Sequence, residues 1–224
     1  MTKSDIQKTR IENKLPVARE GLPFIIPGVV ITALLGYSGM VSAAIFIGLM
    51  TLFTIYFFRD PDRAGNAGDN GVLSPADGTI IDIRHLEDVS NSLGRPALKV
   101  SIFMSVFNVH VNRIPIKGRI SGIKYNQGKF LSANLDKASE QNENNRITIE
   151  TLNGTRIVFT QIAGLIARRI VCWIKENDNV DAGQRFGLIR FGSRVDIYLP
   201  PETRINVRMK ERVRAGETII GYLP

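Results

Sequence analysis

The chain begins with a long stretch of residues that carry no charge. No Asp, Glu, Lys or Arg occurs from residue 21 to residue 58, and the small and polar residues Tyr37-Ser38-Gly39 divide the stretch with a turn. The second part, residues 40–58, is long enough to span the hydrocarbon core of a bilayer as one helix. The first part, residues 22–37, is shorter and contains proline, so it could span with a tilt or re-enter.

Basic residues flank this apolar stretch on both sides. Lys and Arg recur in the tail of residues 1–20, and Arg59 and Arg63 follow the stretch. Because Lys and Arg favour the cytoplasmic side, two spans with both ends in the cytoplasm satisfy the charge pattern. We therefore expect residues 21–58 to form a transmembrane helical hairpin that anchors the rest of the chain at the cytoplasmic face of the cell membrane. Signal peptides have an apolar region about half as long, and buried helical pairs rarely lack charge over such a length.

The pattern of the remaining chain is that of β-strands. Short apolar runs, rich in β-branched residues and often alternating with polar ones, are separated by turn residues. Strands are expected at residues 72–73, 79–83, 98–103, 146–150, 156–160, 195–199 and 204–208. Asn153-Gly154 predicts a hairpin between two of them, and short helices are expected at residues 132–143 and 161–169. Residues 59–224 are thus expected to form one mainly β domain.

Glycine recurs every few residues between short apolar runs from Val180 to Gly192. This spacing is typical of a flattened barrel or sandwich of tight turns, and biotinyl and lipoyl carrier domains look similar. A non-catalytic barrel-sandwich module on a membrane hairpin, acting as an adaptor or carrier, is therefore an alternative to an enzyme. The carrier form has less support, because no lysine lies in the Met-Lys-Met or Asp-Lys-Ala context that such domains use.

Composition narrows the choice of partner and cofactor. The 29 Lys and Arg residues exceed the 21 Asp and Glu residues and give a net charge of +8, which favours an anionic membrane surface or nucleic acid as partner. Nucleic acid is poorly supported, because no binding motif appears and the aromatic residues lie mostly in apolar segments. The single cysteine, Cys172, excludes an intramolecular disulfide. With only two histidines besides, a zinc site is implausible and no metal is expected.

Four short segments of the β region combine polar and reactive residues. They are residues 74–78, 107–115, 128–146 and 191–194. In the second segment His110 and Asn112 share one face of the expected strand. Taken singly, the segments have ordinary explanations: an Asp-Gly turn, a structural histidine, a solvated loop and a Gly-Ser turn.

In their order along the chain, the four segments resemble the phosphatidylserine decarboxylases. Phe57-Phe58-Arg59-Asp60-Pro61, residues 164–170 and the Gly183-Gln184 turn share the resemblance, which covers nearly everything from residue 57 to about residue 200. Each motif is weak, but the ordered set is strong. The membrane anchor and the short length are similar to the compact bacterial and archaeal branch of this family.

The resemblance implies a pyruvoyl cofactor that the chain makes from its own Ser193. The Ser193 hydroxyl is expected to attack the carbonyl of Gly192, which leaves a large chain, residues 1–192, and a small chain, residues 193–224, capped by the pyruvoyl group. The pyruvoyl ketone would form a Schiff base with the substrate amine and act as the electron sink when phosphatidylserine becomes phosphatidylethanolamine. An ether lipid of the archaetidylserine type is the alternative substrate. The implied partners are the anionic phospholipid, the membrane and a second copy of the chain in a homodimer.

The resemblance also assigns roles to single residues. Serine needs a positioned base, and His110 is expected to be that base and the later proton donor, with Asp77 orienting it as in a catalytic triad. Longer family members carry a second histidine three residues further on, where this chain has Arg113. Either His110 therefore serves both steps, or Arg113 acts on the substrate by its charge. The expected substrate contacts are Asn112, Arg113, Arg168 and Arg169.

Overall fold

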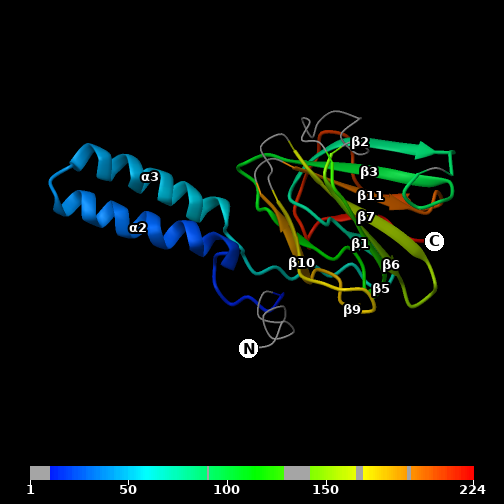
Figure 1. Cartoon of the computed structure of the whole chain (residues 1–224). Coiled ribbons are helices and arrows are strands. Elements are labelled where there is room, and N and C mark those ends of the chain that lie inside the picture. The colour runs from blue at the N-terminus through cyan, green and yellow to red at the C-terminus, as the bar shows by residue number, and fades with distance from the viewer. Residues whose placement is uncertain (1–10, 90, 129–141, 165–168, 191–192) are drawn as a thin grey trace. The chain divides into compact units, whose positions relative to one another are not determined.

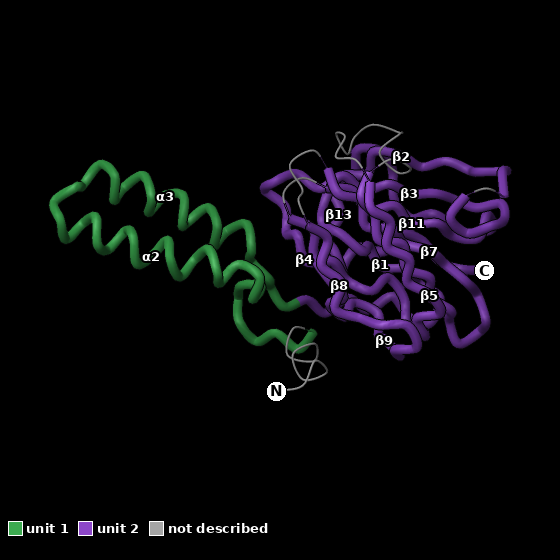
Figure 2. Tube along the Cα trace, in the orientation of Figure 1, with its two compact units in different colours: residues 1–62 green, residues 63–224 purple. Residues whose placement is uncertain are grey.

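The computed structural model describes residues 11–89, 91–128, 142–164, 169–190 and 193–224. The chain divides into two compact units, residues 1–62 and residues 63–224 (Figure 2). The boundary lies just beyond residue 58, where the sequence pattern places the end of the apolar stretch.

The first unit is a hairpin of two apolar helices (Figure 1). A 3-10 turn, Arg19–Gly21, leads into α2, Leu22–Tyr37, and α3, Val41–Phe57, returns alongside α2. The predicted break is the turn between them, in which Gly39 adopts a φ of 78° that glycine enters at little cost. The predicted pair of helices is thus present.

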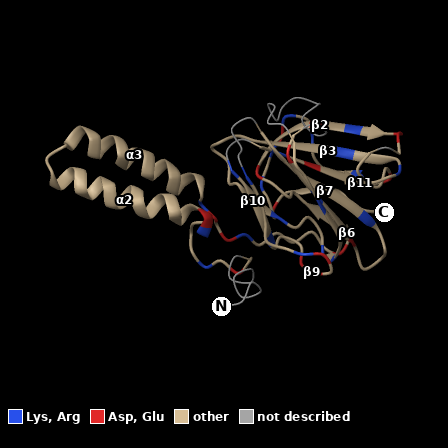
Figure 3. Cartoon of the chain, in the orientation of Figure 1, with Lys and Arg blue, Asp and Glu red and all other residues tan. Residues whose placement is uncertain are grey.

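The helices of the hairpin expose apolar side chains. None of the residues of α2 is buried, and in α3 only Thr51 and Phe57 are. Figure 3 shows both helices free of charge, with charged residues near their base. The segment Arg19–Tyr37, with a mean hydropathy of 1.6, is long and apolar enough to cross a membrane, whereas α3 is shorter.

The two ends of the hairpin are hydrogen-bonded to each other. The Ala18 amide donates to the Phe58 carbonyl at 2.7 Å, and the Asp60 amide donates to the Pro16 carbonyl at 2.8 Å. The buried side chain of Asn13 donates to the Asp60 carboxylate at 3.0 Å. Both flanks therefore leave the hairpin at the same end.

Small residues let the two helices approach closely. A Cβ atom on Gly28 would collide with the Thr51 side chain, and one on Gly48 would lie 3.4 Å from the Thr32 methyl group. Both threonine hydroxyls donate to carbonyls of their own helix at 2.8 Å. The contact is therefore of the small-residue kind that packs helices in an apolar environment.

The second unit contains one large and two small antiparallel sheets (Figure 1). In spatial order, the large sheet consists of β13 (Arg212–Val213), β2 (Gly78–Leu86), β3 (Ala97–Met104), β11 (Ser193–Leu199), β7 (Arg156–Ala163), β6 (Asn144–Glu150), β5 (Gly118–Asn126) and β9 (Asn179–Val180). The small sheets are β1 (Gly71–Leu73), β14 (Ile219–Tyr222) and β12 (Arg204–Ile205), and β4 (Val111–Arg113), β10 (Arg185–Ile189) and β8 (Ile170–Cys172).

The large sheet is curled and encloses a core. Its register shifts between Ile80 and Asp82 in β2 and between Ile120 and Gly122 in β5, and such bulges bend a strand. The inner face is apolar over most of its area, and Phe159 of β7 packs edge to face on Phe186 of β10 with ring centroids 5.1 Å apart. The predicted mainly β architecture of a curled, barrel-like sheet is confirmed.

Most predicted strands are present, and two expectations need correction. The hairpin at Asn153-Gly154 joins β6 to β7 as predicted, with a φ of 77° at Gly154. The helix expected at residues 161–169 is wrong, because residues 161–163 pair with β11 and β6 and extend β7. Strand β12 ends at Ile205, short of the predicted residue 208. The helix expected at residues 132–143 lies almost wholly outside the described residues.

We predict that Gly28→Leu loosens the hairpin, because the new side chain must displace Thr51. Overpacking of this kind costs about 1–3 kcal/mol, so the melting temperature of the hairpin in detergent should fall. Gly36→Leu is the matched control, since no atom lies within 4 Å of a Cβ placed there. Equal melting temperatures for both variants would contradict the close approach of α2 and α3.

Candidate active site

Ser193 lies where three strands of the large sheet end together. It is the first residue of β11 and pairs with Met104, the last residue of β3, and with Ala163, the last residue of β7. Its side chain is fully buried, and its hydroxyl donates to the Met104 thioether sulfur at 3.3 Å. Gly192 lies outside the described residues. The reactive serine predicted from sequence is thus held by strand pairing on both sides.

His110 precedes β4 directly and is also buried. Its Nδ1 atom lies 2.9 Å from the Asn108 carbonyl oxygen. A carbonyl oxygen only accepts hydrogen bonds, so Nδ1 carries the proton and Nε2 is the basic nitrogen of the neutral ring. The His110 carbonyl accepts from the Ile189 amide at 3.4 Å, which ties the histidine to the strand that leads toward Ser193.

The Asp77 carboxylate makes contacts other than the one expected. Arg63 forms a bidentate ion pair with it, in which Nη2 donates to Oδ2 at 2.9 Å and Nη1 donates to Oδ1. The Ala215 amide also donates to Oδ1, at 2.8 Å. Arg63 also donates to the Ala215 carbonyl at 2.8 Å. Within the described part of the chain, the bonds of Asp77 therefore lead to Arg63 and Ala215, whereas His110 Nδ1 bonds the Asn108 carbonyl.

The predicted substrate contacts differ in exposure. Asn112 is fully buried, and its oxygen accepts from Gln161 at 2.9 Å. Arg113 is buried and donates to the Gly183 carbonyl at 2.9 Å, whereas Arg169 is exposed. Arg168 lies outside the described residues. Among these residues, Arg169 is the described cation that a ligand can reach from solvent.

Arg169 stands near a tyrosine and a glutamate at the same edge of the sheet. Burial and a hydrogen bond to the Glu143 carboxylate raise the pKa of Tyr125 to about 12, and the positive charge of Arg169 opposes this rise. The Glu143 carbonyl accepts from the Ala163 amide at 2.9 Å, and Ala163 pairs with Ser193. An exposed cation therefore lies in the neighbourhood of the strand end that carries Ser193.

A buried ion network follows Ser193 on the opposite face of β11. The guanidinium of Arg194 binds the Asp196 carboxylate at 2.5 and 3.0 Å, and the Lys99 ammonium lies 3.4 Å from it. Burial alone would raise the pKa of Asp196, but Arg194 and Lys99 outweigh burial and hold this pKa below its usual value. Asp196 is therefore ionised and neutralised by two cations in the interior.

Several residues of this region carry no obvious signal in the sequence. Met104 directly follows the strand predicted at residues 98–103, Gln161 begins the helix predicted at residues 161–169, and Arg63 lies between the predicted elements. A polar residue at an inward position of an apolar strand, as Gln161 is between Phe159 and Ala163, is the pattern that could have singled out one of them.

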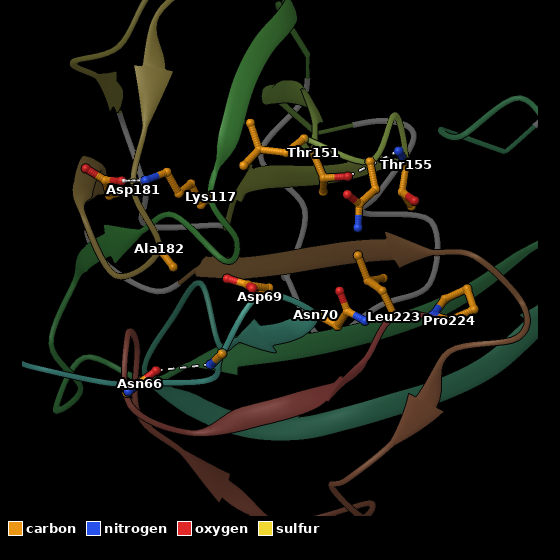
Figure 4. Close-up of a pocket in the computed structure, with 13 residues that line it drawn as sticks. Asn66, Asp69, Asn70, Lys117, Thr151, Thr155, Asp181, Ala182, Leu223 and Pro224 are labelled. Atoms are coloured by element: carbon orange, nitrogen blue, oxygen red, sulfur yellow. Dashed lines mark hydrogen bonds and ion pairs between the residues drawn. The ribbon is translucent and has the colours of Figure 1, made fainter.

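A polar cavity of about 790 Å³ lies elsewhere on the second unit (Figure 4). Figure 4 shows Thr151 and Thr155 on one side of it and Asp69 and Asn70 on the other. Lys117 and Asp181 form an exposed ion pair of 3.2 Å at its rim. None of the predicted site residues lines this cavity.

Comparisons with known proteins agree with the family that the sequence resembles. The family model described as phosphatidylserine decarboxylase matches residues 50–221. The chain is 52% identical to the phosphatidylserine decarboxylase proenzyme of Syntrophus aciditrophicus, over 92% of this chain and 96% of that protein. It is 49% identical to the proenzyme of Desulfotalea psychrophila, over 95% and 99% of the two chains, and 47% identical to that of Geobacter metallireducens, over 93% and 97%.

The chain belongs to the phosphatidylserine decarboxylase family. The predicted resemblance is thereby confirmed, and the family is one of enzymes, which favours catalysis over the alternative of a non-catalytic adaptor or carrier. The matched relatives are named as proenzymes.

We predict that Asp196→Asn lowers the free energy of unfolding by about 3–5 kcal/mol at neutral pH, because it leaves buried cations without their counter-charge. The depressed pKa of Asp196 means that the wild-type chain has this stabilisation above an Asp pKa of about 4 and loses it as pH falls through the folded pKa. The difference between the two proteins should therefore shrink below about pH 4.

Denaturant unfolding of the detergent-solubilised chain between pH 7 and pH 3 measures this difference. Asp181→Asn is the control, since it breaks the exposed ion pair with Lys117 and should change stability by less than about 1 kcal/mol. A difference between wild type and Asp196→Asn that stays constant with pH would show that Asp196 does not carry the buried charge.

Proposed function

We propose that this chain is a self-processing proenzyme that decarboxylates phosphatidylserine to phosphatidylethanolamine. Its membership of the phosphatidylserine decarboxylase family supports the reaction. The observation that carries the proposal is the position of Ser193: a buried hydroxyl at the first residue of β11, preceded by glycine in the sequence. Glycine has no side chain to obstruct an attack on its carbonyl group and tolerates strained backbone.

Self-cleavage begins with the exchange of an amide bond for an ester bond. A bond forms between Ser193 Oγ and the carbonyl carbon of Gly192, the bond from that carbon to the Ser193 nitrogen breaks, and the hydroxyl proton passes to the nitrogen. A base then removes the Ser193 α-proton, and the ester leaves as the new carboxylate of Gly192. Water replaces the amino group of the remaining dehydroalanine as ammonia, which leaves a pyruvoyl cap on residues 193–224.

His110 is the proposed base. Its Nδ1–H is held by the Asn108 carbonyl, so its Nε2 can take a proton and return it. A backbone carbonyl thus does the orienting that a carboxylate does in a catalytic triad. Asp77 stays a proposed member of the site through a different contact: together with Arg63 it binds Ala215, which belongs to the proposed small chain.

The surroundings of Ser193 fit a pyruvoyl group. The neighbours across the strands, Met104 and Ala163, are uncharged and fully buried, so they place no charge beside the ketone. Once formed, the group supplies the electron sink that decarboxylation of an amino acid requires. Arg169 is the proposed contact for the lipid phosphate, because a guanidinium binds phosphate oxygens in pairs. The contact of Arg168 with the substrate stays a prediction, as does a homodimer formed with a second copy of the chain.

The helical hairpin is the proposed membrane anchor. Its exposed apolar surface and its hydrogen-bonded base support an inserted hairpin whose two basic flanks stay on one side. We assign this side to the cytoplasm of the cell membrane, where anionic lipids attract a chain with a net charge of +8. The substrate then lies in the same membrane as the enzyme.

We predict that the purified chain releases carbon dioxide from vesicles containing phosphatidylserine and forms phosphatidylethanolamine. Ser193→Ala should lose this activity entirely, because it has no hydroxyl with which to make the cofactor. Vesicles of archaetidylserine test the ether-lipid alternative with the same assay. Turnover of the ether lipid alone would identify archaetidylserine, and not phosphatidylserine, as the substrate. Turnover of neither lipid by the cleaved wild-type chain would contradict the proposal.

We also predict that the small chain stays bound after cleavage. Strand β11 pairs with β3 along its whole length and with β7 over most of it, and β13 and β14 pair with strands of the large chain. Both chains should therefore elute together from a sizing column in mild detergent and separate only in denaturant. Loss of residues 193–224 under native conditions would contradict the central place of β11.

A further inference from the structure

A row of buried amide side chains crosses the interior of the second unit and ends beside Ser193. The row consists of Asn145 of β6, Gln161 of β7 and Asn112 of β4, each at most 2% exposed. On β6 and β7 the next inward positions, Ile147 and Phe159, are apolar. The inward-facing polar side chains of these two strands are therefore confined to the end of the sheet at which Ser193 lies.

Hydrogen bonds join the three amides in one direction. The Asn145 amide nitrogen donates to the Gln161 side-chain oxygen at 3.0 Å, and the Gln161 nitrogen donates to the Asn112 oxygen at 2.9 Å. The Asn112 nitrogen in turn lies 3.7 Å from the Met104 sulfur, which also accepts the Ser193 hydroxyl at 3.3 Å. The row thus runs without interruption from β6 to the serine.

Each amide in the row fixes the orientation of the next. An amide side chain accepts only at its oxygen and donates only at its nitrogen. Because Gln161 receives a bond at its oxygen, its nitrogen must point at Asn112. Because Asn112 then receives a bond at its oxygen, its nitrogen must point at Met104. The row therefore presents a donor, and not an acceptor, to the thioether that holds the serine.

The Met104 thioether is a suitable hydrogen-bond acceptor for a serine hydroxyl that must later react. Sulfur is a weak acceptor, so the hydroxyl is held in place and yet little is lost when it turns toward the carbonyl group that it attacks. A carboxylate or carbonyl at the same position would bind the hydroxyl more strongly and oppose that turn. Burying an amide lowers the stability of the fold unless its donors and acceptor are bonded. Three buried amides in one row therefore favour a role in the site at which the row ends.

We propose that Asn145, Gln161 and Asn112 are positioning residues for self-cleavage, and that they set the place of the Ser193 hydroxyl through Met104. This inference rests on the proposed function, namely that Ser193 cuts the bond before it. In this role the three amides exchange no proton with the reacting groups. They act by keeping the nucleophile within reach of its target.

The rate of self-cleavage of the whole chain tests the inference. Pulse-labelled chain is followed on denaturing gels as residues 193–224 appear. Gln161→Met keeps the volume and removes both bonds of the amide, and the rate should fall between about tenfold and about a hundredfold, as for other losses of alignment. Thr160→Val is the matched control: Thr160 is buried beside Gln161 on the other face of β7, and its hydroxyl has no hydrogen-bond partner among the described residues. Its rate should be that of the wild type.

A double-mutant cycle separates positioning from a general loss of structure. If Gln161 acts through Met104, then Gln161→Met combined with Met104→Leu should cleave no more slowly than the slower single variant. Rate losses that multiply would mean that the two residues act independently and would overturn the proposal. Should Gln161→Met fail to fold, Asn112→Asp serves instead, since it keeps an oxygen for Gln161 and puts a carboxyl oxygen in place of the amide donor aimed at Met104.

The outcomes also separate this inference from the proposed function. A wild-type chain that stays uncut would refute the proposed function itself. A wild-type chain that is cut, together with a folded Gln161→Met or Asn112→Asp variant cut at the same rate, would refute only the role of the amide row.

Discussion

The pairing of β11 on both sides is the constraint on which the rest of the structure depends. Strands β3 and β7 hydrogen-bond to β11 from its first residue, Ser193. Sheet hydrogen bonds fix backbone position and side-chain direction together, so the proposed reactive residue cannot shift along the sheet. The same bonds explain how the proposed cut directly before β11 would leave the sheet intact. One set of backbone contacts therefore serves both the chemistry and the cohesion of the two proposed chains.

The two faces of β11 support this arrangement in different ways. The inner face places Ser193 at the end of a row of neutral amides. The outer face buries Arg194 and Asp196 as a paired unit with Lys99. Buried ion pairs contribute little net stability but strongly disfavour arrangements that separate their members. The register of the strand is thus specified by charge on one face and by hydrogen bonding on the other.

The sequence sufficed to predict most of the elements and to propose Ser193 as the reactive residue. The long stretch without charged residues indicated the helices, and the alternation of apolar and polar residues indicated most strands. Ser193 and His110 stood in recognisable motifs. Sequence could not predict which groups these residues touch, because the partners come from distant segments. Asp77 meets Arg63 and Ala215, and His110 is oriented by a carbonyl two residues away. Gln161 was expected in a helix because its apolar neighbours fit either period, and only pairing with β6 and β11 decides for a strand.

The intact mass of the purified protein tests the central claim most directly. The account predicts two chains, residues 1–192 and residues 193–224, the smaller lacking the mass of one ammonia molecule relative to its encoded sequence. Ser193→Ala should give one uncut chain of 224 residues. A folded wild-type protein that remains a single chain of full mass would contradict the account, because the buried serine at the head of β11 would then make no cofactor.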